Sequence, residues 1–259
     1  MKCNIVIANY NYSKWIEGCI VSALTQTYKD TVISVVDDCS TDNSVDIAIK
    51  TLGLEKENVI ETDTYLAWMN EDKTRQVFKL KNNSGPSTAR NTAIAYNIDT
   101  CDFFAPLDAD DEICVTKIDI LVGELKKFPH VGCIYADYTI LDINTNKLTY
   151  EFKRTYSFEK LMNECIVHSG CVVTKEALKS TLENTGYYDV RIKGPEDYDL
   201  WLRISEKFMI LHYPEILTTV RSTGQNISNT NLPQNSENYR KGFEILNAKL
   251  YARRNGIVS

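Results

Sequence analysis

The feature that most restricts how this chain folds is a regular alternation, through its first half, of short β-prone runs and segments with helical periodicity. Each β-prone run ends in a polar turn, after which apolar residues recur at helical spacing. The β-prone runs are 3–8, 32–36 and 101–107, and the helical segments that follow them are 16–24, 45–52 and 118–125. Alternation at this pitch predicts the α/β class, with a parallel sheet covered by helices on both faces.

One further helix is predicted before the third of these runs. Pro86 or Ser87 is suited to begin it, and Ala89, Ala93 and Tyr96 then share one face. Two strand-like runs, VIET and VFKL, precede this helix and flank a polar stretch that the pattern does not assign.

The second half of the chain has a different pattern. After about Val131, shorter strands joined by turns mix with helices, and no Pro/Gly/Ser-rich linker separates the two halves. One domain with two lobes is therefore expected. An Asn-rich loop that begins at Gln225 leads into a final helix predicted over 239–253.

Composition excludes several classes of protein. The chain has 259 residues, of which 43% are hydrophobic, enough for a sizeable core, and its net charge of −6 leaves no basic surplus for a nucleic-acid partner. It has no run of 18 apolar residues and no signal-like start, so we expect a soluble, cytoplasmic protein. Its eight cysteines are scattered without a CxxC pair, which predicts free thiols and no structural zinc site.

Polar side chains follow three of the predicted strands, in each case at the carboxyl end. These clusters are 9–11, then Asp37 and Asp38, then Asp108, Asp110 and Asp111. Because the carboxyl ends of parallel strands meet at one edge of a sheet, where ligands bind, we expect the three clusters to lie together.

The cluster DADDE comes abruptly after the apolar run FFAPL. Carboxylates as close as Asp108 and Asp110 repel each other unless a cation lies between them. Mg²⁺ or Mn²⁺, held by one or two carboxylates and by substrate phosphates, suits this arrangement. The alternative is that DADDE caps the helix that starts near Thr116 and is simply solvated.

The other polar positions each allow two interpretations. Asp38 is either a turn residue or an acceptor for a ligand's N–H and hydroxyl groups. Tyr10 and Tyr12 form an aromatic wall for a flat ring or pack against the protein. Arg90, in SGPSTARN, pairs with a phosphate near a helix N-terminus or lies on the surface of that helix.

The segment KGPEDYDLWLRISEKF predicts a helix that starts at Pro195. Its inward face carries Asp197, Leu200, Trp201, Ile204 and Phe208. Burial raises the pKa of a carboxyl and a helix N-terminus stabilises its charged form, so Asp197 is a candidate general base. The alternative, an acidic helix N-terminus, fits Glu196 and Asp199 better than Asp197.

Five pieces of the sequence together resemble the family 2 glycosyltransferases, inverting GT-A enzymes that transfer a sugar from a nucleotide diphosphate sugar. The pieces are IVIANYNYSKWIEGCIVSALTQTY, VVDDCSTDNS, NNSGPSTARNTAI, FFAPLDADDEI and GPEDYDLWLRI, in the family's order. The resemblance implies a Rossmann-like, mixed and mostly parallel sheet flanked by helices, with a smaller acceptor-side lobe and a C-terminal helix. The implied units are 1–225, divided into a nucleotide-sugar half, 1–112, and an acceptor half, 113–225, followed by a loop and helix, 226–259.

The resemblance also implies a role for each matching position. The base and ribose are implied to contact Ala8, Asn9, Tyr10 and Asp38, and the nucleotide is implied to contact Arg90. The metal is implied to bind the DxD pair Asp108 and Asp110, with Asp110 as the direct ligand. The catalytic base that acts on the acceptor is implied to be Asp197. Glu196 and Trp201 flank that base.

Two positions are less closely matched. His168 lies where the family places acceptor-side residues, and the alternative is a hydrogen-bonded strand histidine. Family members often have an arginine and then a histidine before the C-terminal loop, whereas here Arg221 precedes Ser222. Arg221 alone is therefore expected to serve the metal or diphosphate contact.

The implied activity is inverting transfer from a UDP- or TDP-sugar, with Mn²⁺ or Mg²⁺, to an acceptor hydroxyl in polysaccharide or glycoconjugate synthesis. The acceptor is a saccharide, a lipid-linked saccharide or a protein. Lys249, Arg253 and Arg254 also predict contact with an anionic membrane surface. Two alternatives are less favoured. A sugar-phosphate nucleotidyltransferase would have a Gly-rich loop after the first strand, whereas NYNYSKW has no glycine. A non-catalytic GT-A fold would lack one of the two acidic motifs, and both are present.

Overall fold

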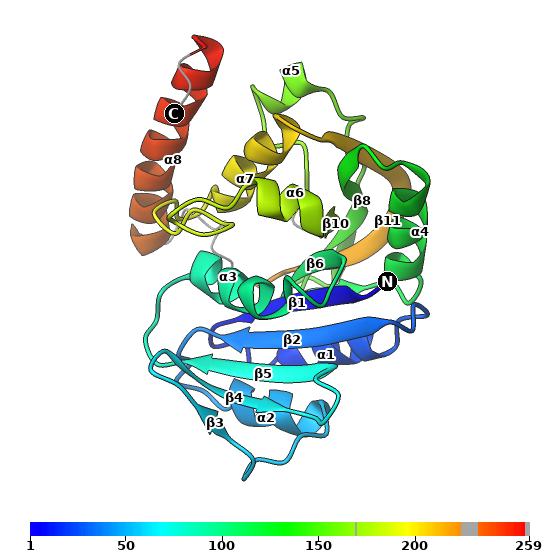
Figure 1. The fold of residues 1–259 in the computed structure, drawn as a ribbon, viewed down its shortest axis with the longest axis vertical. Coiled ribbons are helices and arrows are strands. Elements are labelled where there is room, and N and C mark those ends of the chain that lie inside the picture. The colour runs from blue at the N-terminus through cyan, green and yellow to red at the C-terminus, as the bar shows by residue number, and fades with distance from the viewer. Residues whose placement is uncertain (169, 224–232, 257–259) are drawn as a thin grey trace.

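A computed structural model describes residues 1–168, 170–223 and 233–256 of the chain (Figure 1). The strands are β1 (Cys3–Asn9), β2 (Thr31–Asp37), β3 (Ile60–Glu61), β4 (Tyr65–Met69), β5 (Arg75–Leu80), β6 (Phe103–Asp108), β7 (Glu112–Ile113), β8 (Val131–Asp142), β9 (Lys147–Glu151), β10 (Cys171–Thr174) and β11 (Met209–Ser222). The helices are α1 (Ile16–Leu24), α2 (Ser44–Thr51), α3 (Pro86–Asn97), α4 (Lys117–Lys127), α5 (Phe158–Leu161), α6 (Lys175–Ser180), α7 (Glu196–Ser205) and α8 (Pro233–Arg254).

In the part of the chain that the structure describes, the strands form one sheet in the order β3-β4-β5-β2-β1-β6-β10-β8-β11-β7, with β9 paired to β8. Strands β5, β2, β1 and β6 are parallel, and antiparallel strands flank them on both sides. The expected α/β class, a mixed sheet flanked by helices, is confirmed. The stretch that the sequence pattern left unassigned forms β4, which pairs antiparallel with β5.

The two faces of the sheet carry separate cores. Along β1, Ile5 and Ile7 pack against α1, α2 and α4, whereas Val6 between them packs against the other face. That other face is covered by α3, α6, α7 and α8 (Figure 1). This alternation follows from the two-residue period of a strand, and full burial of each such side chain contributes about 1.5–3 kcal/mol. The apolar run of β1 is explained by burial on both faces.

The sheet opens beside the end of β6. Strand β10 pairs only with Phe103 and Phe104, so the remainder of β6 has no strand partner on that side. Pro106 lies in this second part, where its missing N–H removes no bond to β10. The opening leaves space for side chains from α3 and α7 to reach Asp108 at the end of the strand.

Helix α8 is part of the folded body. It starts earlier than the predicted 239–253, and its Leu246 and Leu250 are buried in the core shared with α7. Gly242 faces the carbonyl of Lys193 so closely that a Cβ there would lie 2.4 Å from the oxygen. Across the described residues, no helix has the length and apolar character needed to cross a membrane. The eight cysteines are all free thiols.

Candidate active site

The three polar clusters meet at one edge of the sheet, as the sequence predicted. The parallel register places Asn9 beside Asp37 and Ala8 beside Asp108. The ends of β2, β1 and β6 therefore present their last residues side by side, and Tyr10 follows directly with 45% of its surface exposed. These neighbours form one side of the candidate site.

The acids at the end of β2 are held by the protein itself. Asp37 is fully buried and accepts hydrogen bonds from Asn9 Nδ2 at 2.6 Å and from the Ser40 N–H at 2.8 Å. The two oxygens of Asp38 accept from the Ser84 and Gly85 N–H groups, each at 2.7 Å. Burial nevertheless raises the pKa of Asp38 above its ordinary value. Asp38 thus joins the end of β2 to the loop that starts α3.

The acids after β6 are arranged differently. The Asp108 side chain is 39% exposed, whereas Asp110 and Asp111 are almost completely buried. Burial, reinforced by the charge of Asp108, raises the pKa of Asp110 to about 7, although the Tyr12 hydroxyl bonds to it. The same two causes raise the pKa of Asp111 well above its ordinary value. Like charges are therefore concentrated here with few local donors.

Arg221 encloses this acidic turn from β11. Its backbone N–H donates to Asp111 Oδ1 at 3.0 Å, and its Nη1 donates to the Asp110 carbonyl at 2.8 Å. The guanidinium also bonds to Glu112 and lies over the Trp15 ring. Arg221 therefore orders the acidic turn in the position that the sequence associated with the metal or diphosphate.

Arg90 joins the two acidic motifs. Its Nη2 donates to Asp108 Oδ1 at 2.7 Å, and its Nη1 donates to Glu196 Oε1 at 2.9 Å. Although burial acts in the opposite direction, Asp197 and Asp108 raise the pKa of the guanidinium well above its ordinary value. Arg90 is 4% exposed, which excludes the surface arginine that the sequence left open. It is the cation around which the site is assembled.

Asp197 lies in the first turn of α7, beside Arg90. Its Oδ1 is 3.6 Å from Arg90 Nη1, and among the residues described no donor is within hydrogen-bonding distance of this buried oxygen. Burial raises the pKa of Asp197 to about 7, against the lowering effect of Arg90. The side chain is still 23% exposed through its other atoms, so the carboxylate is open to an incoming hydroxyl group. A carboxylate with an accessible edge and a pKa near neutrality is suited to remove a proton.

Glu196 holds the chain at the start of α7. Its Oε1 accepts from Arg90 and its Oε2 accepts from the Gly194 N–H at 2.8 Å. Gly194 has a φ of 101°, a conformation that favours glycine. Trp201, one turn further on, is completely buried, so it supports α7 from within the core. The two neighbours of the candidate base thus have positioning roles.

The acids after β6 fit a divalent cation bound jointly with a ligand. Over the described ranges, no three His, Cys, Asp or Glu side chains are grouped to hold a metal by themselves. Asp108 is exposed, and burial with the charge of Asp108 raises the pKa of Asp110, so a cation would relieve the repulsion between these two carboxylates. A hard divalent ion takes one or two carboxylates and completes its shell with phosphate and water. The residues present fit that mode of binding.

His168 has the hydrogen bond and the stacking of a buried neutral ring. It stacks on Tyr138 with ring centroids 4.0 Å apart, and its Nδ1 accepts from the Gly170 N–H at 3.0 Å. Burial, with the charges of Lys117 and Lys153, lowers its pKa well below the ordinary value. The geometry accounts for the ring without a ligand, in line with the alternative that the sequence left open.

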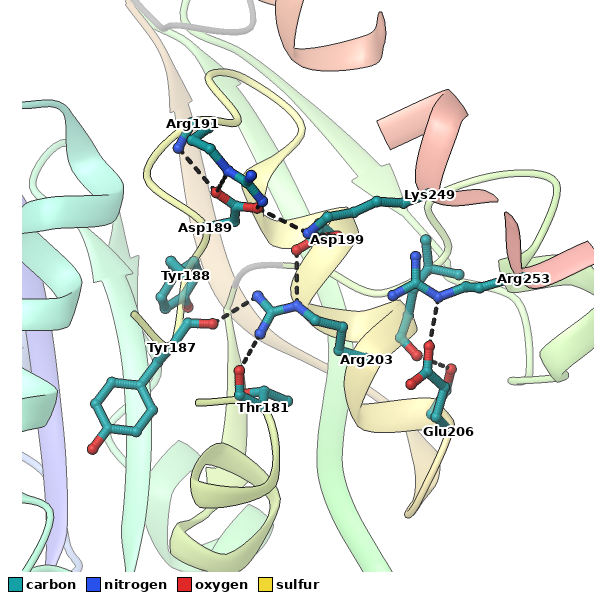
Figure 2. A network of polar contacts seen from close by, with 12 residues as sticks. Thr181, Tyr187, Tyr188, Asp189, Arg191, Asp199, Arg203, Glu206, Lys249 and Arg253 are labelled. Atoms are coloured by element: carbon teal, nitrogen blue, oxygen red, sulfur yellow. Dashed lines mark hydrogen bonds and ion pairs between the residues drawn. The ribbon is translucent and has the colours of Figure 1, made fainter. Parts of the chain in front are cut away.

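A network of buried charges joins α8 to α7 (Figure 2). Lys249 Nζ reaches Asp189 at 2.9 Å and Asp199 at 3.0 Å, and both carboxylates have no exposed surface. Arg203 donates to Asp199 at 2.8 Å and also bonds to two backbone carbonyls. Because unpaired charges are costly to bury, this network strongly constrains α8.

The same contacts remove the basis for the predicted membrane contact. Lys249 is used in the network, Arg253 pairs with Glu206, and Arg254 donates to the Met162 carbonyl. The basic residues of α8 are thus engaged within the protein.

Several residues of the site were not singled out from the sequence. The Lys193 charge partly offsets the rise that burial causes in the pKa of Asp38, and the Tyr188 ring lies under Arg90 at 5.4 Å. The Tyr239 ring packs against Gly194. Lys193 and Gly194 are adjacent to the acidic motif in the sequence, which is a usable signal. Tyr239 comes from a distant helix and has no local signal.

With this geometry established, the comparisons with known proteins identify the chain. The profile of the family described as Glycosyl transferase family 2 matches residues 4–182. The chain belongs to this family. As a family 2 glycosyltransferase domain, it is a transferase enzyme, and the resemblance found in the sequence is confirmed.

One relative of this family 2 domain is the chondroitin synthase of Escherichia coli, 28% identical over 248 residues. The match covers 95% of this chain but only 32% of that relative. The chain therefore spans about a third of the length of this relative, and the name chondroitin synthase refers to the whole of that protein.

Solved structures of low sequence identity share the fold. TarS 1–349 of S. aureus, in complex with UDP, superposes with a TM-score of 0.63 at 20% identity, over 86% of this chain and 61% of that chain. The mannosyltransferase PcManGT of Pyrobaculum calidifontis, in complex with GDP-Man and Mn²⁺, gives 0.59 at 16% identity, over 84% and 56%. Both comparisons support the fold alone.

Proposed function

We propose that this domain transfers a sugar from a UDP- or TDP-sugar to a hydroxyl of a saccharide acceptor, with inversion at the anomeric carbon. The observation that carries the proposal is the position of Arg90, which bonds to Asp108 of the first acidic motif and to Glu196 of the second. This contact supports a single site that contains the donor-side acids and the candidate base. In this proposal 1–112 binds the donor and 113–225 binds the acceptor, followed by the C-terminal loop and helix, 226–259.

The proposed chemistry is a single displacement. The Asp197 carboxylate takes the proton of the acceptor hydroxyl as the hydroxyl oxygen bonds to the anomeric carbon. The bond from this carbon to the diphosphate oxygen breaks, and the nucleotide diphosphate leaves with the electron pair. Arg90 stabilises the charge that develops on the leaving group. One base suffices for this reaction, and no covalent sugar–enzyme intermediate forms.

A divalent cation belongs to the same proposal. Asp108 and Asp110 would hold Mn²⁺ or Mg²⁺, with Asp110 as the direct ligand. When bound, the ion supplies positive charge to the diphosphate. The two acids otherwise face that diphosphate as like charge, so nucleotide affinity should depend on the metal. The PcManGT complex, with its Mn²⁺, supports this choice by fold alone.

The donor and acceptor classes draw on the relatives. The UDP complex of TarS supports a pyrimidine nucleotide, and Asp38 with 8–10 is proposed to contact the base and ribose. The name of the chondroitin synthase supports a saccharide chain as acceptor, in polysaccharide or glycoconjugate synthesis. Chondroitin oligosaccharides are therefore the first acceptors to test.

A donor screen tests the proposal. UDP-, TDP- and GDP-sugars are supplied with Mn²⁺, and the released nucleotide and the anomeric configuration of the product are measured, the latter by proton NMR. We expect release from a UDP- or TDP-sugar and an inverted product. Calorimetry of UDP with Mn²⁺ or with EDTA should show binding only with the metal. Retention of configuration, or equal UDP affinity in EDTA, would contradict the mechanism or the metal role, respectively.

A further inference from the structure

Helix α8 has an inner and an outer side. Its inner side carries Gly242, Leu246 and Lys249, which contact the body of the protein. A second line of residues is spaced by four positions, so it turns from the inner side of the helix at Tyr239, past Phe243 and Asn247, to the exposed Tyr251. Phe243 is 39% exposed and Tyr251 is 64% exposed. Two large aromatic rings are thus open to solvent on one line.

These residues border a cavity. A space of about 350 Å³ lies between α8 and the segment that follows α5. Phe243, Asn247 and Tyr251 line it from α8, and Asn163 and Arg254 close it at one end. Tyr198 of α7 also lines it, and this residue follows Asp197 directly. The cavity therefore extends from the helix that carries the candidate base.

The line of residues continues toward the base itself. The Phe243 ring is 6.1 Å from the Tyr239 ring, centroid to centroid. The Tyr239 ring packs against Gly194, where a Cβ would lie 2.6 Å from it, and Gly194 is bonded to Glu196. Glu196 and Asp197 also help burial to raise the pKa of the Tyr239 hydroxyl to about 12. Tyr239 therefore connects the cavity to the acidic end of α7.

The position of this surface is fixed. Lys249 pairs with two fully buried carboxylates, one of them on α7, while Leu246 and Leu250 are buried beneath the helix. Figure 2 shows the pairing of Lys249 with Asp199, which holds α8 against α7. From Tyr239 to Tyr251 the helix rises by about 18 Å, long enough for several sugar units.

We propose that the cavity between α8 and the segment after α5, bordered by Phe243, Asn247 and Tyr251, binds the saccharide chain whose terminal hydroxyl reaches Asp197. The chemistry fits: aromatic rings pack on the C–H faces of sugars, and amide groups bond to their hydroxyls. Asn247 provides such an amide. This inference rests on the proposed transferase function and adds the acceptor subsites beyond the reacting unit.

Acceptor length tests the inference. Transfer is measured to a chondroitin disaccharide and octasaccharide and to a single sugar linked to a lipid diphosphate, for wild type, Phe243→Ala and Tyr251→Ala. Phe128→Ala, an equally exposed ring at the end of α4, is the matched control. We expect Phe243→Ala and Tyr251→Ala each to raise the KM for the octasaccharide roughly 3–10-fold. The KM for the disaccharide, the KM for the donor and all values for the control should stay unchanged.

Other outcomes would contradict saccharide binding in this cavity. Equal octasaccharide KM in wild type and variants, or wild-type enzyme that does not prefer the octasaccharide, would overturn the inference. So would an effect confined to the lipid-linked sugar, because the cavity would then bind lipid. If no nucleotide is released from any donor, the proposed transferase function is contradicted instead, so the two failures can be distinguished. Circular dichroism of each variant confirms that it is folded.

Discussion

The turn after β2 and the turn after β6 look alike in the sequence, since each presents acids at the carboxyl end of a buried parallel strand, yet the protein treats them in opposite ways. Asp37 and Asp38 accept hydrogen bonds at 2.6–2.8 Å from Asn9 at the end of β1 and from backbone N–H groups of neighbouring turns. Asp108 and Asp197 instead lie beside the charge of Arg90, and Asp110 interacts with Tyr12 and with the charge of Arg221.

The difference separates structural acids from chemically poised ones. The first pair accepts hydrogen bonds from neutral donors: Asn9 at the end of β1, Ser40 in the turn itself, and the loop before α3. In the second group, Asp108 and Asp197 share the buried guanidinium of Arg90, whereas Asp110 interacts with Tyr12 and Arg221. Burial and mutual repulsion raise the pKa of Asp110 and of Asp197 to about 7. Acids with raised pKa values around a shared buried cation are an expected location of function.

The largest expected effect comes from removing the candidate base. Asp197→Asn keeps the shape but not the proton acceptor, so transfer should fall by roughly 10²–10⁴-fold while UDP affinity persists. Steady-state kinetics and calorimetry measure the two. Asp37→Asn is the matched change in the other region, and it should lower thermal stability without reducing turnover of the folded enzyme. Near-normal turnover in Asp197→Asn would erase the contrast between the regions.

The second effect concerns the shared cation. Arg90→Met leaves the charges of Asp108, Glu196 and Asp197 without their buried partner, so the free energy of unfolding should fall by about 3–5 kcal/mol. Denaturant unfolding measures it. Arg240→Met is the control, because that arginine is 62% exposed in its pair with Glu244 and should change stability by less than about 0.5 kcal/mol. Similar losses in both variants would show that Arg90 is not the centre of the site.

The third effect is smaller and tests whether the first region has any role in binding. Asp38→Ala removes the acceptor for two N–H groups beside the proposed nucleotide site, so UDP affinity should weaken by about 1–3 kcal/mol. Calorimetry with Mn²⁺ present measures this, with Asp37→Ala for comparison. If Asp38→Ala destabilises the fold and leaves UDP affinity unchanged, Asp38 is a structural residue only.

Much of the fold was predictable from the sequence because its central strands and helices are local patterns. Helix α1 has the predicted bounds, and the ends of β1, β2 and β6 meet as parallel pairing requires. Strand β4 was missed because YLAWM lies between polar stretches and is only partly buried. The full length of α8 was also missed, since its first residues continue a polar, Asn-rich loop.

The site was predictable where a residue type and a position coincide, as for Asp108 and Asp197. It was not predictable where a long-range contact decides the role. The sequence left Arg90 open between the surface and a ligand, and only the fold shows it buried between two acids. Lys249 was interpreted as a membrane contact, whereas it pairs with Asp189 and Asp199. No local pattern contains the partner of a charge that lies many residues away.

The last prediction uses the pH dependence of activity to distinguish Asp197 from Asp110, the two acids whose pKa is raised to about 7. A general base must be ionised, so with an Asp197 pKa of about 7 the value of kcat/KM should fall about tenfold one pH unit below the pKa and level off above it. The same raised pKa means that the folded protein binds this proton more tightly than the unfolded chain does. The contribution of Asp197 to stability therefore decreases as pH rises from the ordinary carboxyl range to about 7, while activity increases. Saturating Mn²⁺ should hold Asp110 ionised, so the limb that remains in the activity profile belongs to Asp197. If kcat/KM stays constant down to pH 5 under these conditions, another residue is the base and Asp197 has only a structural role.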